Sequence, residues 1–244
     1  MKLVTGALGF IGSHYCKEPV CYIDNRTSNK VNSVKGYEYS DKNMQFEYII
    51  HLAANAKITG DINYELLESN IAFTSKIFNT FKGSKILYAS SAAIYEKNNM
   101  YSISKAHNEW LAKGFNATGF RFFNVYGERD NGIVGKILNA IKNDDVLSIY
   151  GGHQIRDFVS VKDIVRTLEE EQDSKEKIIE IGTGVGTSIY ELIEMCEEVS
   201  GKKLKYKQED RKEYEQLKSV CNNPISKYIK LKDGIQELWK TLEK

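Results

Sequence analysis

Tyr101 and Lys105 lie four residues apart in the segment Tyr-Ser-Ile-Ser-Lys. On a helix this spacing places both side chains on one face. A phenol has an ordinary pKa of about 10 and is a poor base at neutral pH, but a neighbouring ammonium favours the phenolate and lowers that pKa. Ser91 follows a predicted strand and offers a hydroxyl to the phenol and to a substrate oxygen. These three side chains predict acid/base chemistry with Tyr101 as the proton carrier.

A Tyr-x-x-x-Lys pair on its own is most often a pair of surface residues, so its context matters. Tyr95 is a rival tyrosine, but the residue four positions later is Asn99, so no lysine supports it. The order of motifs favours Tyr101: a glycine-rich turn, an acidic strand end, a Ser-Ser pair and then Tyr-x-x-x-Lys.

The segment from Thr5 to Gly12 reads Thr-Gly-Ala-Leu-Gly-Phe-Ile-Gly and joins a predicted strand to a predicted helix. Its glycines permit a tight turn and a close approach to a pyrophosphate, and the helix start presents free N–H groups. Asp24 ends the second predicted strand, where a carboxylate accepts hydrogen bonds from ribose hydroxyls and repels a 2′-phosphate. NAD is therefore favoured over NADP, although Arg26 lies close by. The structural alternative is a simple turn, with Asp24 as a turn residue.

Short apolar runs alternate with helical patterns along the chain, which predicts a doubly wound parallel sheet of the Rossmann-like α/β class. A small, mainly helical lobe is expected at the C-terminal end. The predicted strands are 2–5, 20–24, a short one within 34–41, 48–52, 85–88, 118–123, 147–150 and 178–181. The predicted helices are 11–17, 63–81, 102–113, 133–143 and 161–170, with a mainly helical, charged end from residue 188.

The composition is that of an ordinary globular protein. The 244 residues carry a net charge of +1, which favours neither nucleic acid nor an acidic membrane surface as a partner. No twenty-residue apolar run and no secretory signal are found. The four cysteines lack zinc-site spacing, so we expect no metal, free thiols and a reducing, cytoplasmic compartment.

Several motifs together resemble the extended short-chain dehydrogenase/reductase family, in its nucleotide-sugar epimerase and dehydratase branch. The resemblance runs from residue 1 to about residue 190. It implies an NAD-binding domain at 1–125 and 156–182 and a substrate-binding lobe at 126–155 and 183–244. The motifs that carry it are TGALGFIGSH, YIDN, HLAA, YASSAAIY, YSISK, RFFNVYG, IRDFVSVKDIV and IEIGTG.

The resemblance also implies roles for individual residues. Asp41 is expected beside the adenine, Asn70 against the cofactor-side backbone, and Arg156 on the nucleotide diphosphate. The structural alternatives are that Phe123 is simple core and that Arg156 and Asp157 form a local ion pair. The implied cofactor contacts are Gly6, Gly9, Phe10, Ile11, Gly12, Asp24, Asn25, Asp41, Leu52, Ala53, Ala54, Asn70, Ala89, Tyr101, Lys105 and Phe123. The implied catalytic residues are Ser91, Tyr101 and Lys105, and the implied substrate contacts are Ser91, Asn124, Arg156 and Arg211.

The reaction type is indicated by the residues after Ser91. Dehydratases of the branch usually place an acid there, whereas this chain has Ala92 and Ala93, which resembles an epimerase acting at C4 of a nucleotide-sugar. A dehydratase or reductase and a heptose epimerase, which also carries the SSAA pattern, remain alternatives. So does a catalytically silent dinucleotide-binding module. The resemblance further implies a homodimer formed through the helices at 63–81 and 102–113.

Overall fold

The computed structural model describes residues 1–17, 20–24, 36–38, 45–56, 64–96, 99–213 and 215–243. The chain divides into two compact units. The first comprises Met1–Phe122 with Val165–Ile179, and the second Phe123–Ile164 with Glu180–Lys244. Residues 156–164, which the sequence assigned to the first domain, thus lie in the second unit.

A central sheet forms the first unit, with the order β10-β6-β5-β4-β1-β2-β3. Strands β3, β2, β1, β4, β5 and β6 pair in parallel, which confirms the predicted doubly wound α/β class. Because parallel strands end at one edge, the segments that follow β1, β2, β4 and β5 share that edge. The strands are β1 (Lys2–Thr5), β2 (Val20–Ile23), β3 (Gly36–Glu38), β4 (Tyr48–His51), β5 (Lys85–Ser91), β6 (Ala117–Phe122) and β10 (Ile178–Ile181).

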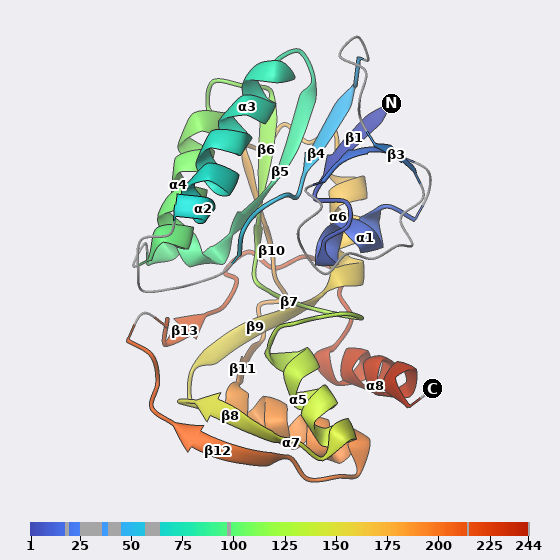
Figure 1. Cartoon of the computed structure of the whole chain (residues 1–244), viewed down its shortest axis with the longest axis vertical. Coiled ribbons are helices and arrows are strands. Elements are labelled where there is room, and N and C mark those ends of the chain that lie inside the picture. The colour runs from blue at the N-terminus through green and yellow to red at the C-terminus, as the bar shows by residue number, and fades with distance from the viewer. Residues whose placement is uncertain are drawn as a thin grey trace. The chain divides into compact units, whose positions relative to one another are not determined.

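Helices pack on this sheet over an apolar core. Figure 1 shows α2, α3 and α4 grouped on one side of the sheet, with α1 and α6 on the other. Leu3, Ile49 and Ile86 of adjacent strands belong to one core cluster with Phe78 of α3, and all four are fully buried. None of the described helices is long and apolar enough to cross a membrane. The helices are α1 (Phe10–Tyr15), α2 (Tyr64–Leu67), α3 (Phe73–Thr80), α4 (Met100–Ala112) and α6 (Val161–Glu170).

The single helix predicted at 63–81 is three segments. A π-helical turn, η1 (Glu68–Ala72), lies between α2 and α3. The apolar spacing does not reveal this turn, because it adds one residue to a continuous helical path. Such turns often occur at functional sites, and this one buries Asn70 completely. The next helix, α4, begins at a capping box in which Asn99 and Ser102 satisfy each other's backbone N–H groups.

The second unit contains two small sheets and three helices among its described residues. One sheet has the order β11-β9-β13, with β7 also paired to β9, and the other pairs β12 with β8. Its core includes Tyr126, Leu138, Phe158, Leu192 and Trp239. The strands are β7 (Asn124–Tyr126), β8 (Val146–Tyr150), β9 (Ile155–Ser160), β11 (Gly186–Ser188), β12 (Lys205–Glu209) and β13 (Lys218–Ser219). The helices are α5 (Ile133–Asn143), α7 (Ile189–Ser200) and α8 (Leu231–Leu242).

The end of the chain is less helical than its sequence predicted, because β12 and β13 lie between α7 and α8. The residues of β12 read Lys-Tyr-Lys-Gln-Glu and are largely exposed. They therefore lack the alternation of apolar and polar side chains that marks a half-buried strand. Backbone pairing with β8, not local pattern, makes this segment a strand.

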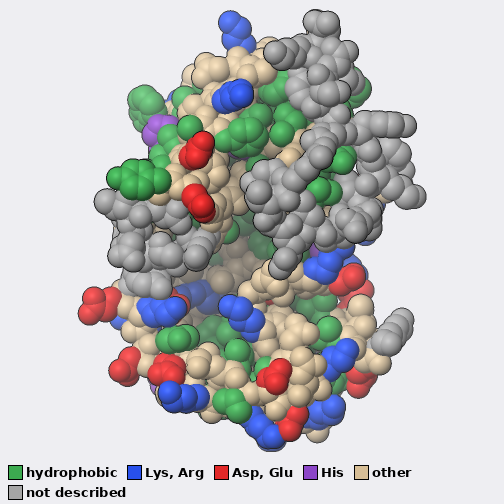
Figure 2. Space-filling model, viewed as in Figure 1, with side chains coloured by type: hydrophobic (Ala, Val, Ile, Leu, Met, Phe, Trp, Pro, Cys, Tyr) green, Lys and Arg blue, Asp and Glu red, His purple; other side chains and the backbone are tan. Residues whose placement is uncertain are grey.

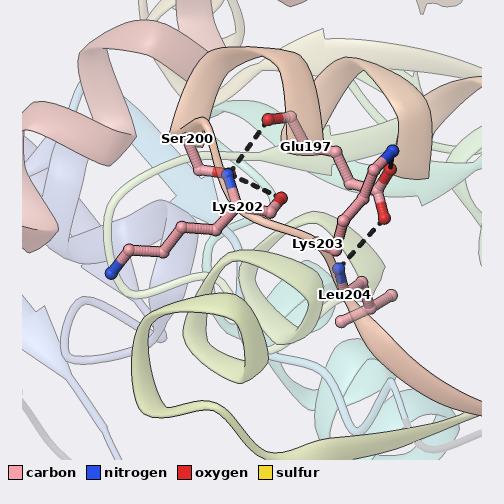
Figure 3. Close-up of polar contacts among 5 residues, drawn as sticks. All are labelled: Glu197, Ser200, Lys202, Lys203 and Leu204. Carbon is pink, nitrogen blue, oxygen red and sulfur yellow. Dashed lines mark hydrogen bonds and ion pairs between the residues drawn. The ribbon is translucent and has the colours of Figure 1, made fainter.

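Figure 3 shows how α7 ends and the chain turns towards β12. Gly201 adopts the left-handed conformation that closes a helix, with φ +67°. Glu197 accepts a hydrogen bond from the backbone N–H of Leu204 at 3.0 Å and forms an ion pair with Lys203. The Ser200 hydroxyl accepts from the Lys202 N–H at 3.3 Å. Local polar contacts thus set the direction in which β12 begins.

Candidate active site

The glycine-rich turn after β1 is packed too closely to accept side chains at two positions. Gly6 has φ +71°, and a Cβ there would lie 2.6 Å from the backbone nitrogen of Ala53. A Cβ on Gly12 would lie 2.1 Å from the Gly6 carbonyl oxygen. Gly9 precedes Phe10, where α1 begins. The turn therefore packs against the segment after β4 and has glycine where a side chain would clash.

Asp24, which follows β2, is tied to this turn. Its Oδ2 accepts a hydrogen bond from the Leu8 N–H at 2.7 Å. The Leu52 N–H donates to the Thr5 carbonyl oxygen at 3.0 Å, so the predicted wall of Leu52, Ala53 and Ala54 begins beside β1. The turn, the carboxylate and the wall are brought together at the carboxyl edge of the sheet. Asn25 and Asp41 lie outside the described residues.

Asn70 connects three elements from its buried position in η1. Its Oδ1 accepts from the Asn55 N–H at 2.7 Å, and its Nδ2 donates to the Asn55 carbonyl oxygen at 3.0 Å. The same nitrogen contacts the Ser104 hydroxyl of α4 at 3.1 Å. Asn70 thereby holds the segment after β4 against the helix that carries Tyr101.

Ser91, Tyr101 and Lys105 converge at the end of β5. Ser91 is the last residue of β5, and the other two lie on α4. Ser91 and Tyr101 share a hydrogen bond. The Lys105 Nζ lies 5.7 Å from the centroid of the Tyr101 ring and donates to the carbonyl oxygen of Ala89 at 2.8 Å. The structure thus brings together the three side chains that the spacing predicted to act as a unit.

Burial controls the titration of this group. Burial raises the pKa of Tyr101 above its ordinary value, and the hydrogen bond with Ser91 opposes that rise. Burial lowers the pKa of Lys105 to about 8. The shift of Tyr101 is opposite to the one expected from the Tyr–Lys spacing, because removal from water outweighs the favourable contacts of the phenolate. Lys105 still carries a positive charge at neutral pH.

Tyr95 occupies a different environment. It is 54% exposed, and its hydroxyl accepts a hydrogen bond from Arg121 at 3.0 Å. Its ring also faces the Arg121 guanidinium, 5.2 Å from centroid to Cζ. Tyr95 is therefore held by an arginine rather than by the lysine that supports Tyr101.

His51 at the end of β4 belongs to the site's support and was not singled out in the sequence. Its Nδ1 lies 2.7 Å from the Thr5 hydroxyl and its Nε2 lies 2.9 Å from the Thr74 hydroxyl. Burial, together with the charge of Lys105, lowers the pKa of His51 to about 3. The imidazole is neutral and links β1, β4 and α3. The available signal was a lone polar residue in the apolar run Tyr-Ile-Ile-His-Leu.

Residues 2–182 match the sequence model of the NAD dependent epimerase/dehydratase family. The chain belongs to this family. The expectation of NAD as the cofactor is confirmed at the level of the family, and the resemblance drawn from the motifs is confirmed with it.

Individual relatives of this epimerase/dehydratase chain differ in their reactions. It is 30% identical to the UDP-N-acetyl-alpha-D-glucosaminuronate decarboxylase of Bacillus cytotoxicus, over 78% of this chain and 77% of the relative. It is 27% identical to the ADP-L-glycero-D-manno-heptose-6-epimerase of Brachyspira hyodysenteriae, over 95% and 97%. The solved UDP-N-acetylglucosamine 4-epimerase of Methanobrevibacter ruminantium M1, in complex with UDP-N-acetylmuramic acid, superimposes with a TM-score of 0.84 at 26% identity, covering 100% and 98%.

The other predicted residues of this family member lie in the second unit. Phe123 is buried and donates its N–H to the Ile181 carbonyl oxygen at 3.2 Å, and Asn124 begins β7. Arg156 lies on β9, half-buried, between Thr187 of β11 and Ser219 of β13 in the pairing register. Arg211 is exposed in the loop after β12 and donates to the Glu215 carbonyl oxygen at 2.6 Å. Phe123 and Asn124 are consecutive, so these four residues come from three separate segments.

Asp157 is a functional neighbour that the sequence interpretation treated only as a possible partner of Arg156. It is fully buried and accepts hydrogen bonds from the backbone N–H groups of Thr183, Gly184 and Cys221 at 2.8 to 3.1 Å. The Thr183 hydroxyl donates to it at 2.6 Å. Asp157 thus joins the loop after β10 to the segment after β13.

Proposed function

We propose that the chain is an NAD-dependent nucleotide-sugar epimerase that inverts C4 through a transient 4-keto sugar, with Tyr101 as the acid/base. The observation that carries the proposal is the convergence of Ser91, Tyr101 and Lys105 at the carboxyl end of β5. The family supports a dinucleotide-dependent enzyme. The short turn after Ser91 holds Ala92 and Ala93, which carry no acid for eliminating water.

The residues at the sheet edge fit NAD. The bare backbone at Gly6, Gly9 and Gly12 suits a pyrophosphate, with Phe10 and Ile11 at the start of α1 beside it. Asp24 offers a carboxylate for the adenosine ribose, and Lys105 an ammonium for the nicotinamide ribose. NAD is favoured over NADP because the carboxylate repels a 2′-phosphate. The remaining proposed contacts are Asn25, Asp41, Leu52, Ala53, Ala54, Asn70, Ala89 and Phe123.

Three side chains divide the acid/base work. When bound, NAD would supply the hydride acceptor for oxidation of the sugar and the hydride donor for its reduction on the opposite face. The Tyr101 phenolate takes the proton of the C4 hydroxyl as C4 is oxidised and returns it to the oxygen of the reduced product. The Ser91 hydroxyl holds the phenolic oxygen and the sugar oxygen, and the Lys105 ammonium stabilises the phenolate. Asn124, Arg156 and Arg211 are proposed to bind the phosphates and the sugar, since a guanidinium suits phosphate oxygens.

A panel of nucleotide-sugars tests the proposal directly. Purified protein is incubated with UDP-, GDP-, ADP- and dTDP-sugars, and products are followed by NMR for inversion at C4, with absorbance at 340 nm for NADH. We expect an equilibrium of C4 isomers with no net NADH. Formation of a 4-keto-6-deoxy product indicates a dehydratase. A chain that binds NAD and converts no nucleotide-sugar is a silent binding module, and the proposal is then wrong.

A 6-epimerase acting on a nucleotide-bound heptose is the second candidate. It is favoured by the similarity to the Brachyspira hyodysenteriae enzyme, which extends over nearly the whole of both chains. The two candidates share Ser91, Tyr101 and Lys105 and differ in the carbon presented to them. Including an ADP-heptose in the panel separates them, because the inverted centre is then C6 and no hexose isomer forms.

We further propose that the protein is a cytoplasmic homodimer. Trp110 of α4 is 67% exposed, and Ile103 of α4 and Tyr64 of α2 are also exposed. Figure 2, drawn in the same view as Figure 1, shows hydrophobic side chains among charged ones over the region of these helices. Sedimentation of wild-type protein and of Trp110→Glu tests the dimer: we expect dimer and monomer respectively. All four cysteines are buried thiols, which suits a reducing compartment.

A further inference from the structure

A carboxylate–guanidinium pair lies directly beside the strand end that carries Ser91. Glu109 of α4 accepts two hydrogen bonds from Arg121 of β6, one from Nε at 2.9 Å and one from Nη2 at 2.7 Å. Their side chains are 12% and 21% exposed. A paired, largely shielded contact of this kind is much stronger than a single ion pair on an open surface.

This pair holds both ends of the segment that contains Ser91. At one end, the buried Ser90 hydroxyl donates to Glu109 Oε1 at 2.6 Å, and Ser90 lies opposite Arg121 in the strand register. At the other end, Arg121 Nη1 donates to the Tyr95 hydroxyl, and the guanidinium stacks on the Tyr95 ring. Residues 91–94 lie between these two attachments.

The same pair fixes that segment to the helix that carries the proposed base. Glu109 lies one helical turn after Lys105, so both side chains reach β5 from one face of α4. Lys105 contacts the Ala89 carbonyl oxygen and Glu109 contacts Ser90. The Ser91 hydroxyl, which bonds to Tyr101, therefore follows immediately after two consecutive residues anchored to α4.

We propose that Glu109 and Arg121 are positioning residues that set the distance between the Ser91 hydroxyl and the Tyr101 phenol. The proposal rests on the function proposed above for its effect on turnover. In this proposal Tyr95 has a structural role, because its hydroxyl and ring bind Arg121 at the far end of the segment that contains Ser91. Neither Glu109 nor Arg121 is required to touch substrate or cofactor.

The consequence for titration follows from the groups around Tyr101. On its own helix, the Lys105 ammonium approaches the Tyr101 ring and the Glu109 carboxylate is paired with Arg121. Ser91 is the neutral donor on β5, and His51 on β4 is neutral because burial lowers its pKa to about 3. The Ser91 hydrogen bond lowers the pKa of Tyr101. When the pair is broken and that bond lengthens, the pKa of Tyr101 rises. Because turnover requires the Tyr101 phenolate, the rise of kcat with pH must then occur at higher pH than in the wild type.

The test compares Glu109→Gln with Glu170→Gln, which makes the same change in the exposed Arg166–Glu170 ion pair of the first unit. We expect Glu109→Gln to lower kcat roughly 10- to 100-fold, since small misplacements of a catalytic group have effects of that size. KM for the nucleotide-sugar should stay within about threefold of the wild-type value, because the contacts that bind the substrate in its ground state are retained. The acid limb of the kcat profile moves to higher pH. Glu170→Gln should leave kcat, KM and the pH of the acid limb unchanged.

Two milder variants guard against misfolding. Ser90→Ala removes one hydrogen bond to Glu109, and Arg121→Lys keeps the charge but loses the paired geometry. Both are expected to shift the pH limb in the same direction as Glu109→Gln and by less. Activity that falls only in proportion to the folded fraction, with an unmoved pH limb, would overturn the proposal.

Titration of Tyr101 separates this proposal from the proposed function. Protein labelled with ¹³Cζ-tyrosine gives a resonance for Tyr101, identified by its absence in Tyr101→Phe, and its pKa is read without any turnover. We expect a higher pKa in Glu109→Gln than in wild type and Glu170→Gln. An equal pKa in all three refutes the positioning role even if the enzyme is active. Absence of isomerisation by wild type refutes only the function.

Discussion

The polar groups of the first unit and those of the second are organised in different ways. In the first unit Ser91, Tyr101 and Lys105 contact one another, and Asn70 and His51 hold the surrounding backbone from buried positions. In the second unit Phe123 and Asn124 are consecutive, Arg156 and Arg211 come from two other segments, and Arg211 is exposed. The buried polar centre there is Asp157, which binds backbone groups.

The polar groups of the first unit are those proposed to carry out the reaction, whereas Asp157 of the second unit has a structural role. In the first unit, residues close in sequence motifs are also close in space, because a strand end and the next helix meet directly. In the second unit, Asn124 and Arg156 lie on strands and Arg211 lies in a loop, while Asp157, next to Arg156, joins the loop after β10 to the segment after β13. We therefore expect changes in the first unit to alter the reaction, and changes at Asp157 to alter stability before they alter chemistry.

The largest expected effect comes from the proposed base. Tyr101→Phe removes the phenolic oxygen and should lower turnover by about 10³-fold while NAD stays bound, since acid/base groups contribute on this scale. The measurement is isomer formation by NMR together with NAD binding by calorimetry. The matched control is Tyr206→Phe on β12, where the ring is 44% exposed. A Tyr101→Phe enzyme with near-normal turnover would show that the polar group of the first unit does not carry out the acid/base chemistry.

Asp157 tests the support of the second unit. Asp157→Ala leaves three backbone N–H groups, two of them buried, without their acceptor and should lower the free energy of unfolding by about 3 kcal/mol. Urea denaturation measures the loss, and hydrogen exchange at Thr183, Gly184 and Cys221 locates it. Asp145→Ala, at an exposed aspartate, should change stability by less than about 0.5 kcal/mol. Unchanged exchange at those three amides would contradict the assigned role.

The glycine turn tests the cofactor side of the first unit. Gly12→Ala places a methyl group 2.1 Å from the Gly6 carbonyl oxygen and forces the turn to shift. We expect a loss of stability of about 2 kcal/mol and a drop in NAD affinity of at least about tenfold. Gly83→Ala is the control, because its Cβ meets no atom within 4 Å. Equal NAD affinity in the two variants would argue against a pyrophosphate at the turn.

The last prediction concerns His51 and the dependence of stability on pH. Its folded pKa of about 3 lies below the unfolded value of about 6.5, so protonation favours unfolding. Its contribution is fully present above pH 6.5 and is lost as the pH falls towards 3, with a slope of at most about 1.4 kcal/mol per pH unit. The difference between the stability curves of wild type and His51→Gln should show this slope. His153→Gln, at an exposed histidine, is the matched control.

The sequence by itself determined the fold class, the family resemblance and the identity of the Ser91, Tyr101 and Lys105 group. These depend on local features: alternating strand and helix patterns, glycines where a Cβ does not fit, and a four-residue spacing on one helix. Asp24 was recognisable in the same way, because its position at a strand end follows from the order of elements.

Only the tertiary structure decided how these groups are held. The partners of Asp157 lie 26 to 64 residues away along the chain, and Glu109 meets Ser90 and Arg121 from three different elements. The strand β12 exists through pairing with β8, since its exposed residues show no alternation. The upward pKa shift of Tyr101 is likewise a property of burial, and burial depends on which distant elements cover a side chain.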